Sequence, residues 1–163
     1  MAKTVNFPSH MTADDLQRLE KFLHEKIPVT RAMGTRIVPD AQTGFAVQAP
    51  VALNYNHLHT AFGGSINAIA TLAAYAFLWL RVGENCHVVV RESTIKFERP
   101  IRKTIRARCA SPTADAFRAF DAALCARGRA RLELRVSVDD EEAVAAEFVG
   151  TFVAVSGEPA AHR

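Results

Sequence analysis

The chain has 163 residues, of which 49% are hydrophobic and 23% are charged, with only 8 glycines and 7 prolines. This composition excludes a disordered, collagen-like or low-complexity chain, and the length predicts one globular domain. The net charge of +3 allows an anionic ligand, but the basic runs lack the interleaved aromatic residues that indicate binding to nucleic acid.

Three features bear on the cellular location. The three cysteines are an odd number without CxxC spacing, which argues against a disulfide framework and a zinc ribbon. Residues 1–10 lack the apolar stretch of a signal peptide. The apolar stretch 66–82 contains Asn67, Thr71 and Arg81, and its densest part is shorter than the roughly 20 residues that span a bilayer. We therefore expect a cytoplasmic protein without a membrane partner.

The first elements are a helix and a hairpin. Thr12 is a candidate N-cap, and the following leucines recur at helical spacing until Pro28. Residues 1–30 are thus predicted to be an N-terminal extension with one helix. Segments 35–38 and 45–49 then predict two strands joined by a turn around Pro39, Asp40 and Gly44.

The middle of the chain contains a polar and aromatic loop, Leu53 to Phe62, which closes on Gly63 and Gly64. A helix from Ser65 to Val82 follows, with apolar residues around nearly its whole circumference. Such a helix must be wrapped on most sides by other elements.

The second half alternates between strands and one helix. Strands are predicted around 88–97 and 105–109, a helix over 112–127 that stops at Gly128, strands over 132–138 and 148–155, and a tail over 157–163. One apolar helix among antiparallel strands predicts an α+β fold in which the sheet curls around that helix. We expect a homodimer or a dimer of dimers, because six strands leave sheet edges and faces uncovered.

Two segments carry a resemblance to a known family. They read Asn56-His57-Leu58-His59-Thr60-Ala61-Phe62-Gly63-Gly64-Ser65 and Thr94-Ile95-Lys96-Phe97-Glu98-Arg99-Pro100. With the element order, they resemble the hotdog fold of acyl thioesterases and dehydratases. More specifically, they resemble the thioesterase-like domain that some bacteria carry fused to an N-acetyltransferase, expected here to stand alone over residues 31–156. The resemblance implies hydrolysis of an acyl thioester of coenzyme A or acyl carrier protein, at a site shared by two protomers, with no cofactor beyond that carrier.

The start of the long helix is the predicted catalytic site. The backbone N–H groups of Gly63 and Gly64 could form an oxyanion hole at the positive end of the helix dipole, although two glycines also suit a tight turn. By its distance from the glycines, Asn56 matches an asparagine that orients carbonyl or water in the family, but an Asx-turn would explain it equally well.

The sequence departs from the better-known thioesterase pattern at two positions. Phe62 replaces the histidine before the glycines, and Thr71 stands where the resemblance implies a catalytic carboxylate. A threonine hydroxyl is too weak an acid to be the general base, but it could hold a water molecule. His57 and His59 are the candidate bases because imidazole titrates near neutrality, and Glu92 is a weaker third candidate.

Substrate contacts are expected from three groups of residues. Phe62 and Ser65 flank the glycines, Leu72 and Tyr75 would line an acyl tunnel, and Arg99 and Arg102 could bind the carrier's phosphates. A zinc site from His57, His59 and His87 would be short of ligands, so no metal is expected. The alternatives are a non-catalytic acyl-thioester-binding protein, favoured by the missing helix carboxylate, and a dehydratase or isomerase on the same fold.

Overall fold

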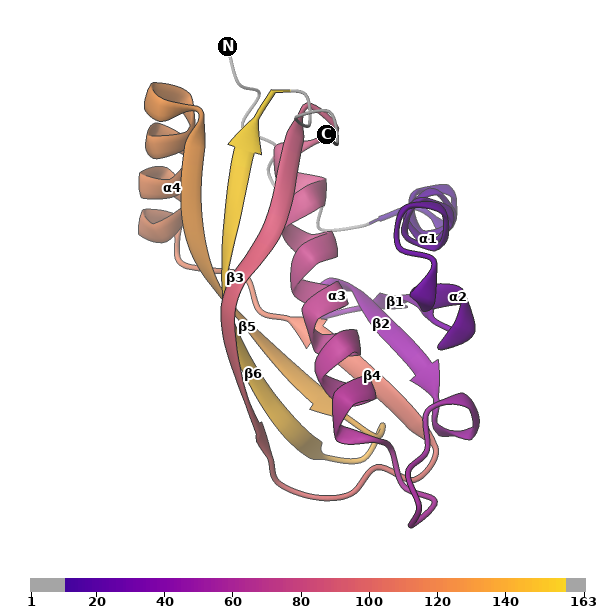
Figure 1. Cartoon of the computed structure of the whole chain (residues 1–163). Helices are drawn as coiled ribbons and strands as arrows, with labels where there is room; N and C mark the ends of the chain where they lie inside the picture. Colours follow the sequence, from indigo (N-terminus) through magenta and orange to yellow (C-terminus); the bar gives the residue numbers. More distant parts are fainter. Residues whose placement is uncertain (1–10, 158–163) are drawn as a thin grey trace, which may run out of the picture.

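The computed structural model describes residues 11–157 as one antiparallel sheet with four helices (Figure 1). The first ten residues and the predicted tail from residue 158 lie outside the described residues. The helices are α1 (Ala13–Lys26), α2 (Val29–Ala32), α3 (Gly63–Val82) and α4 (Ala114–Arg127), with a 3-10 turn at Val51–Leu53. The strands are β1 (Arg36–Asp40), β2 (Gly44–Pro50), β3 (Cys86–Phe97), β4 (Thr104–Cys109), β5 (Arg129–Asp139) and β6 (Val144–Ser156).

The sheet has the order β1-β2-β4-β5-β6-β3, and every neighbouring pair is antiparallel. Figure 1 shows it curling around α3, with α4 beside β5 and with α1 and α2 on the opposite side of α3. The predicted α+β class, element order and wrapped central helix are therefore confirmed.

Helix α3 forms the centre of the core. Its buried residues include Ile69, Phe77 and Leu78, which meet inward-facing residues of the sheet such as Leu134 and Phe148. By length and composition alone α3 could cross a membrane. Half of its apolar window is nevertheless buried inside the domain, which is the property of a core helix.

The N-terminal helix α1 follows the predicted pattern, but a second short helix comes directly after it. Thr12 and Asp15 form a reciprocal capping box, and the buried face of α1 joins the main core. The short helix α2 was not predicted. Pro28, which ends α1, occupies the N-cap of α2, a place where its missing N–H costs nothing.

The two edges of the sheet differ in length and surface. β1 is a five-residue edge that contains Pro39, whereas β3 runs for 12 residues and pairs only with β6 among the strands described here. A bulge between Val90 and Glu92 interrupts the alternation of β3. The β3 edge exposes Val89, Val90 and Phe97 together with the charged residues Arg91, Glu92 and Lys96, so it is a long edge of mixed polarity that is open to pairing.

Candidate active site

The functional helix α3 begins two residues earlier than predicted, at Gly63, so both glycines belong to its first turn. The first N–H groups of a helix have no acceptor within the helix. At α1 and α4 a threonine caps these groups, but at α3 the N-cap is Phe62, which provides no side-chain hydrogen bond. The amides of Gly63 and Gly64 are thus left for a ligand at the positive end of the helix dipole.

Packing against two aromatic rings explains why both positions are glycine. A Cβ at Gly63 would lie 3.3 Å from Cζ of Phe97, and one at Gly64 would overlap the ring of Phe62. Both rings are about half exposed, at 52% for Phe97 and 56% for Phe62. The glycines therefore let two aromatic side chains flank the free amides, a packing role that is compatible with binding a carbonyl there.

Asn56 organises the loop that precedes the helix. Its Oδ1 accepts hydrogen bonds from the backbone N–H of Leu58 at 2.9 Å and of Thr60 at 3.2 Å, and its Nδ2 donates to Thr60 Oγ1 at 3.1 Å. The side chain is thus engaged within its own loop, as in the Asx-turn reading. In this structure Asn56 shapes the loop that carries the two candidate histidines.

His57 and His59 are both exposed at the tip of that loop. His59 adopts a left-handed backbone with φ of 56° and stacks on Tyr55, with ring centroids 5.4 Å apart. Thr71 lies two helical turns beyond Gly63, about 12 Å along the axis. The structure therefore places the candidate bases at the mouth of the site and Thr71 deeper along the helix.

Thr71 faces an apolar cavity of about 270 Å³. Leu72 and Tyr75 line the same cavity, so three of the predicted residues are brought together there. The other walls come from the α1–α2 segment and from two strands, through Ile27, Val29, Met33, Ala68, Val88, Val89, Val90 and Phe152. Thr71 Oγ1 donates to the backbone oxygen of Asn67 at 2.8 Å, which leaves its lone pairs as acceptors for a water molecule.

Tyr75 is half-buried in this cavity wall, and burial raises the pKa of its phenol above the usual value of 10.0. The ring is therefore neutral across the physiological range. It contributes an uncharged surface to the cavity.

Two asparagines matter that sequence reasoning overlooked. Asn54 is only 4% exposed. Its side-chain Nδ2 donates to the backbone carbonyl oxygens of Met33 at 2.8 Å and Pro50 at 2.9 Å. Its backbone carbonyl oxygen accepts a hydrogen bond from the N–H of Phe62. Asn67, the one amide side chain in α3, has a buried Oδ1 for which no hydrogen-bond partner is found. The polar residue in an apolar helix was a visible signal for Asn67, whereas no sequence signal pointed to Asn54, because the spacing to the glycines selected Asn56 instead.

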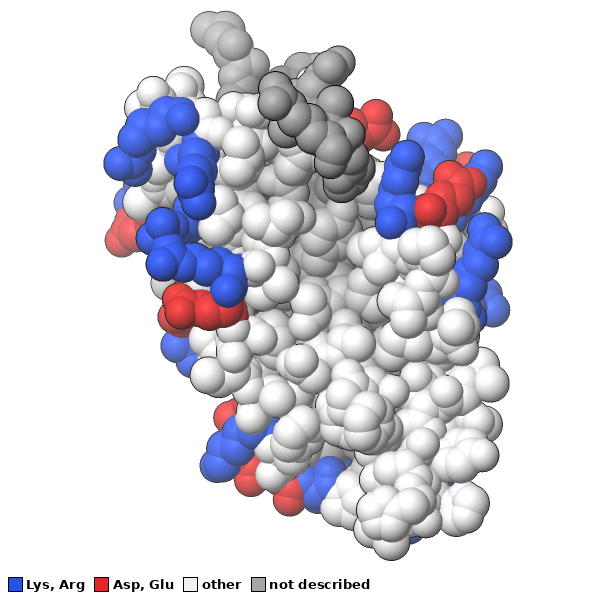
Figure 2. All heavy atoms as spheres, in the orientation of Figure 1, with Lys and Arg blue, Asp and Glu red and all other residues white. Residues whose placement is uncertain are grey.

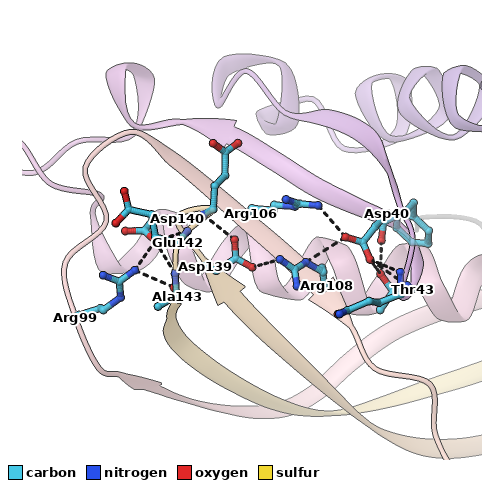
Figure 3. A network of polar contacts seen from close by, with 12 residues as sticks. Asp40, Thr43, Arg99, Arg106, Arg108, Asp139, Asp140, Glu142 and Ala143 are labelled. Carbon is cyan, nitrogen blue, oxygen red and sulfur yellow. Dashed lines mark hydrogen bonds and ion pairs between the residues drawn. The ribbon is translucent and has the colours of Figure 1, made fainter.

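The predicted phosphate-binding arginines lie on the 98–103 loop, next to the start of α3. The N–H of Ala61 donates to the carbonyl of Ile101 at 2.8 Å, which ties this loop to the site. Arg99 and Arg102, together with Lys103, line a polar pocket of about 320 Å³ whose lining also includes the carboxylates of Asp140 and Glu142. Arg99 is partly engaged there, since it pairs with Asp140 and donates to the carbonyl oxygen of Ala143 at 3.0 Å (Figure 3).

Two further arginines of the basic run are committed to ion pairs on the outer face of the sheet. Figure 3 shows Arg106 and Arg108 converging on Asp40, with Arg108 also reaching Asp139 at 2.5 Å. Burial opposes ionisation of Asp40, but hydrogen bonds from Thr43 and the charge of Arg108 outweigh it and lower the pKa of that carboxyl. These side chains stabilise the sheet and are not free for a ligand.

The remaining candidates lie apart from the helix start. Glu92 is exposed on β3, next to the bulge. His87 lies near the first residue of β3 and lines a separate hollow with Trp79. Within residues 11–157, no group of three His, Cys, Asp or Glu side chains could hold a metal ion.

The fold and the site at the start of its central helix define a hotdog-type domain of the thioesterase class. Residues 16–156 match the model of the family described as "Putative thioesterase (yiiD_Cterm)", and the chain belongs to this family. The match covers most of α1 as well as the sheet and α3, so the predicted family resemblance is confirmed.

Solved structures support the same assignment. A protein from Shewanella oneidensis described as a "putative thioesterase" is 26% identical, with a TM-score of 0.77 over 88% of this chain and 99% of that one. A "Probable Thioesterase" from Pseudomonas aeruginosa is 25% identical, with a TM-score of 0.72 over 86% and 95% of the two chains. A thioesterase from Haemophilus influenzae shares the fold at 17% identity, with a TM-score of 0.66 over 90% and 94%.

Proposed function

We propose that this protein hydrolyses an acyl thioester of coenzyme A or acyl carrier protein at the N-terminus of α3. One observation carries the proposal: the uncapped amides of Gly63 and Gly64 lie on the same helix as an apolar cavity that begins one turn further on. Polarising amides beside an apolar cavity suit a carbonyl with an attached acyl chain. Family membership makes that carbonyl a thioester.

In this proposal the carbonyl oxygen accepts hydrogen bonds from the two glycine amides. Thr71 lies about 10 Å along the helix axis from Gly64, so its hydroxyl faces the acyl chain and not the attacking water. His57 or His59, carried on the loop that Asn56 shapes, removes a proton from that water. The water oxygen bonds to the carbonyl carbon, the C–S bond breaks, and the thiol leaves with the proton from the histidine.

The proposed site is completed by a second copy of the chain. The long edge of β3 has unpaired backbone groups and exposes Val89, Val90 and Phe97, and Phe62 at the mouth of the site is 56% exposed. Figure 2 shows that this face is largely free of charged side chains, which gather at its margins. A homodimer paired along β3 would cover this surface and enclose the helix start.

The carrier's phosphates are proposed to bind at the 98–103 loop. Arg102 and Lys103 are exposed beside the half-buried Arg99, and the loop is hydrogen-bonded to the segment that enters α3. Phosphates bound here would lie next to the thioester rather than across the molecule.

A second candidate function is the binding of acyl thioesters without hydrolysis. The observation that favours it is the chemistry of α3, which has no carboxylate anywhere between Gly63 and Val82. In that case the same amides and cavity would hold the ligand, and the histidines would be ordinary loop residues.

The deciding experiment measures the free acid released from a panel of acyl-CoA and acyl-carrier-protein thioesters, by chromatography. The double variant His57→Ala with His59→Ala is compared with Leu58→Ala, which disturbs the same exposed loop without removing an imidazole. Hydrolysis is expected in the parent protein and in Leu58→Ala, and its loss in the histidine variant with thioester binding retained. A parent protein that binds these thioesters and hydrolyses none is a binding protein.

A further inference from the structure

Two hollows lie along one side of α3 and share part of a wall. The first is the 270 Å³ cavity that contains Thr71. The second is a hollow of about 820 Å³ that extends toward the end of the helix, with Phe22 and Trp79 on its aromatic side and Lys26, Glu84 and His87 among its polar lining residues. Tyr75 belongs to both, together with Val88 and Val89 of β3.

These positions form a straight path on the helix surface. Residues three or four apart lie on the same face of a helix, so Gly64, Ala68, Thr71, Tyr75 and Trp79 follow one another along a single stripe. With a rise of 1.5 Å per residue, Tyr75 lies about 16 Å beyond Gly64, and Trp79 lies about 6 Å beyond Tyr75. Tyr75 is therefore placed on the path between the first cavity and the second hollow.

The aromatic side of the hollow beyond Tyr75 suits an apolar chain end. The rings of Trp79 and Phe22 stack there, with centroids 4.0 Å apart and planes at 20°. The stacked pair joins α1 to α3 and forms an aromatic wall in the second hollow. A chain that passed Tyr75 would meet aromatic carbon there.

We infer that Tyr75 is a partition that sets the length of the acyl chain, an inference that rests on the proposed function. An acyl chain whose carbonyl lies at the glycine amides spans about 16 Å to the ring of Tyr75. This distance corresponds to about twelve carbons, because an extended acyl chain lengthens by roughly 1.3 Å per carbon. The ring ends the first cavity. Removing it joins the two hollows and admits about four more carbons.

The first test is the dependence of kcat/KM on chain length, from butanoyl-CoA to octadecanoyl-CoA. The parent protein is expected to lose at least about tenfold in kcat/KM between dodecanoyl-CoA and hexadecanoyl-CoA, since chain atoms beyond the ring have no place. Tyr75→Ala is expected to abolish that loss, and Tyr75→Phe, which keeps the ring, to retain it. An unchanged profile in Tyr75→Ala, or the same change in Tyr75→Phe, overturns the inference.

A second test does not need catalysis. Trp79 is the single tryptophan of the chain, and it lies beyond the partition. Hexadecanoyl-CoA with a terminal bromine is expected to quench its fluorescence in Tyr75→Ala, and to leave it unquenched in the parent protein and Tyr75→Phe. If no thioester is hydrolysed, the proposed hydrolase fails while this readout still decides the partition. Equal quenching in all three proteins, or quenching in none of them, overturns it.

Discussion

Replacing Thr71 by valine tests whether its hydroxyl takes part in catalysis. The change exchanges a hydroxyl for a methyl group of similar size in a cavity that is otherwise apolar. The hydrogen bond that is lost, 2.8 Å from Oγ1 to the carbonyl of Asn67, lies within the helix, so the free energy of unfolding should change by less than about 1 kcal/mol. The acyl chain keeps its apolar contacts, and KM should change little.

The rate should also stay close to that of the parent protein. Because Thr71 lies about 10 Å from Gly64 along the helix axis, its hydroxyl does not reach a water molecule beside the carbonyl, and Thr71→Val should stay within about threefold of the parent kcat. Thr71→Ser is the matched control, since it keeps the hydroxyl and should stay within about threefold of the parent kcat. Steady-state kinetics and urea unfolding on all three proteins separate the two effects. A valine variant at least about tenfold slower than the parent, with the serine variant unaffected, would refute this placement and give the hydroxyl a role in catalysis.

Four further predictions concern the fold and the mouth of the site. Asn54→Ala removes two buried hydrogen bonds and should lower the free energy of unfolding by about 2–4 kcal/mol in urea titrations, so a loss below about 1 kcal/mol would contradict the bridging role. A Cβ at Gly64 would overlap Cε1 of Phe62, so Gly64→Ala must displace the ring that flanks the amides and should lower kcat/KM at least about tenfold; full activity would leave the glycine a packing role only. Because folding lowers the pKa of Asp40, its carboxylate contributes to the free energy of unfolding above pH 3.8, and this contribution is lost as the pH falls through the folded-state pKa. In Asp40→Asn, the free energy of unfolding should therefore fall less steeply at acidic pH than in the parent protein. Val90→Lys should convert a dimer into a monomer in sedimentation experiments, and a monomeric parent protein would refute pairing along β3.

Much of the fold could be predicted because its signals are short-range. Thr12 caps α1 and Thr113 caps α4 as their neighbouring sequences suggested, and the apolar circumference of α3 required a wrapped helix. The strands of the second half alternate in burial as their sequence alternates in polarity, most clearly in β5. Such patterns depend on residues within one or two turns of each other, and a single sequence contains them all.

The candidate site was predictable only in outline. The double glycine, Thr71, Leu72 and Tyr75 lie where the helix pattern put them, since spacing along a helix decides which residues share a face. The roles within the loop were not determined in this way. Asn56 and a neighbouring asparagine look alike in the sequence, but chain packing directs one into its own turn and buries the other.

The sequence by itself therefore determined the family and the central helix, and it predicted the start of that helix as the candidate site. Only the tertiary structure decided that Asn54 joins the α2 segment to the site, that Arg106 pairs with Asp40 across 66 positions of the chain, and that Tyr75 stands between two hollows. The reason is physical. Capping and periodicity arise from local geometry, whereas buried hydrogen bonds, ion pairs and cavities depend on which distant segments the packed core brings together.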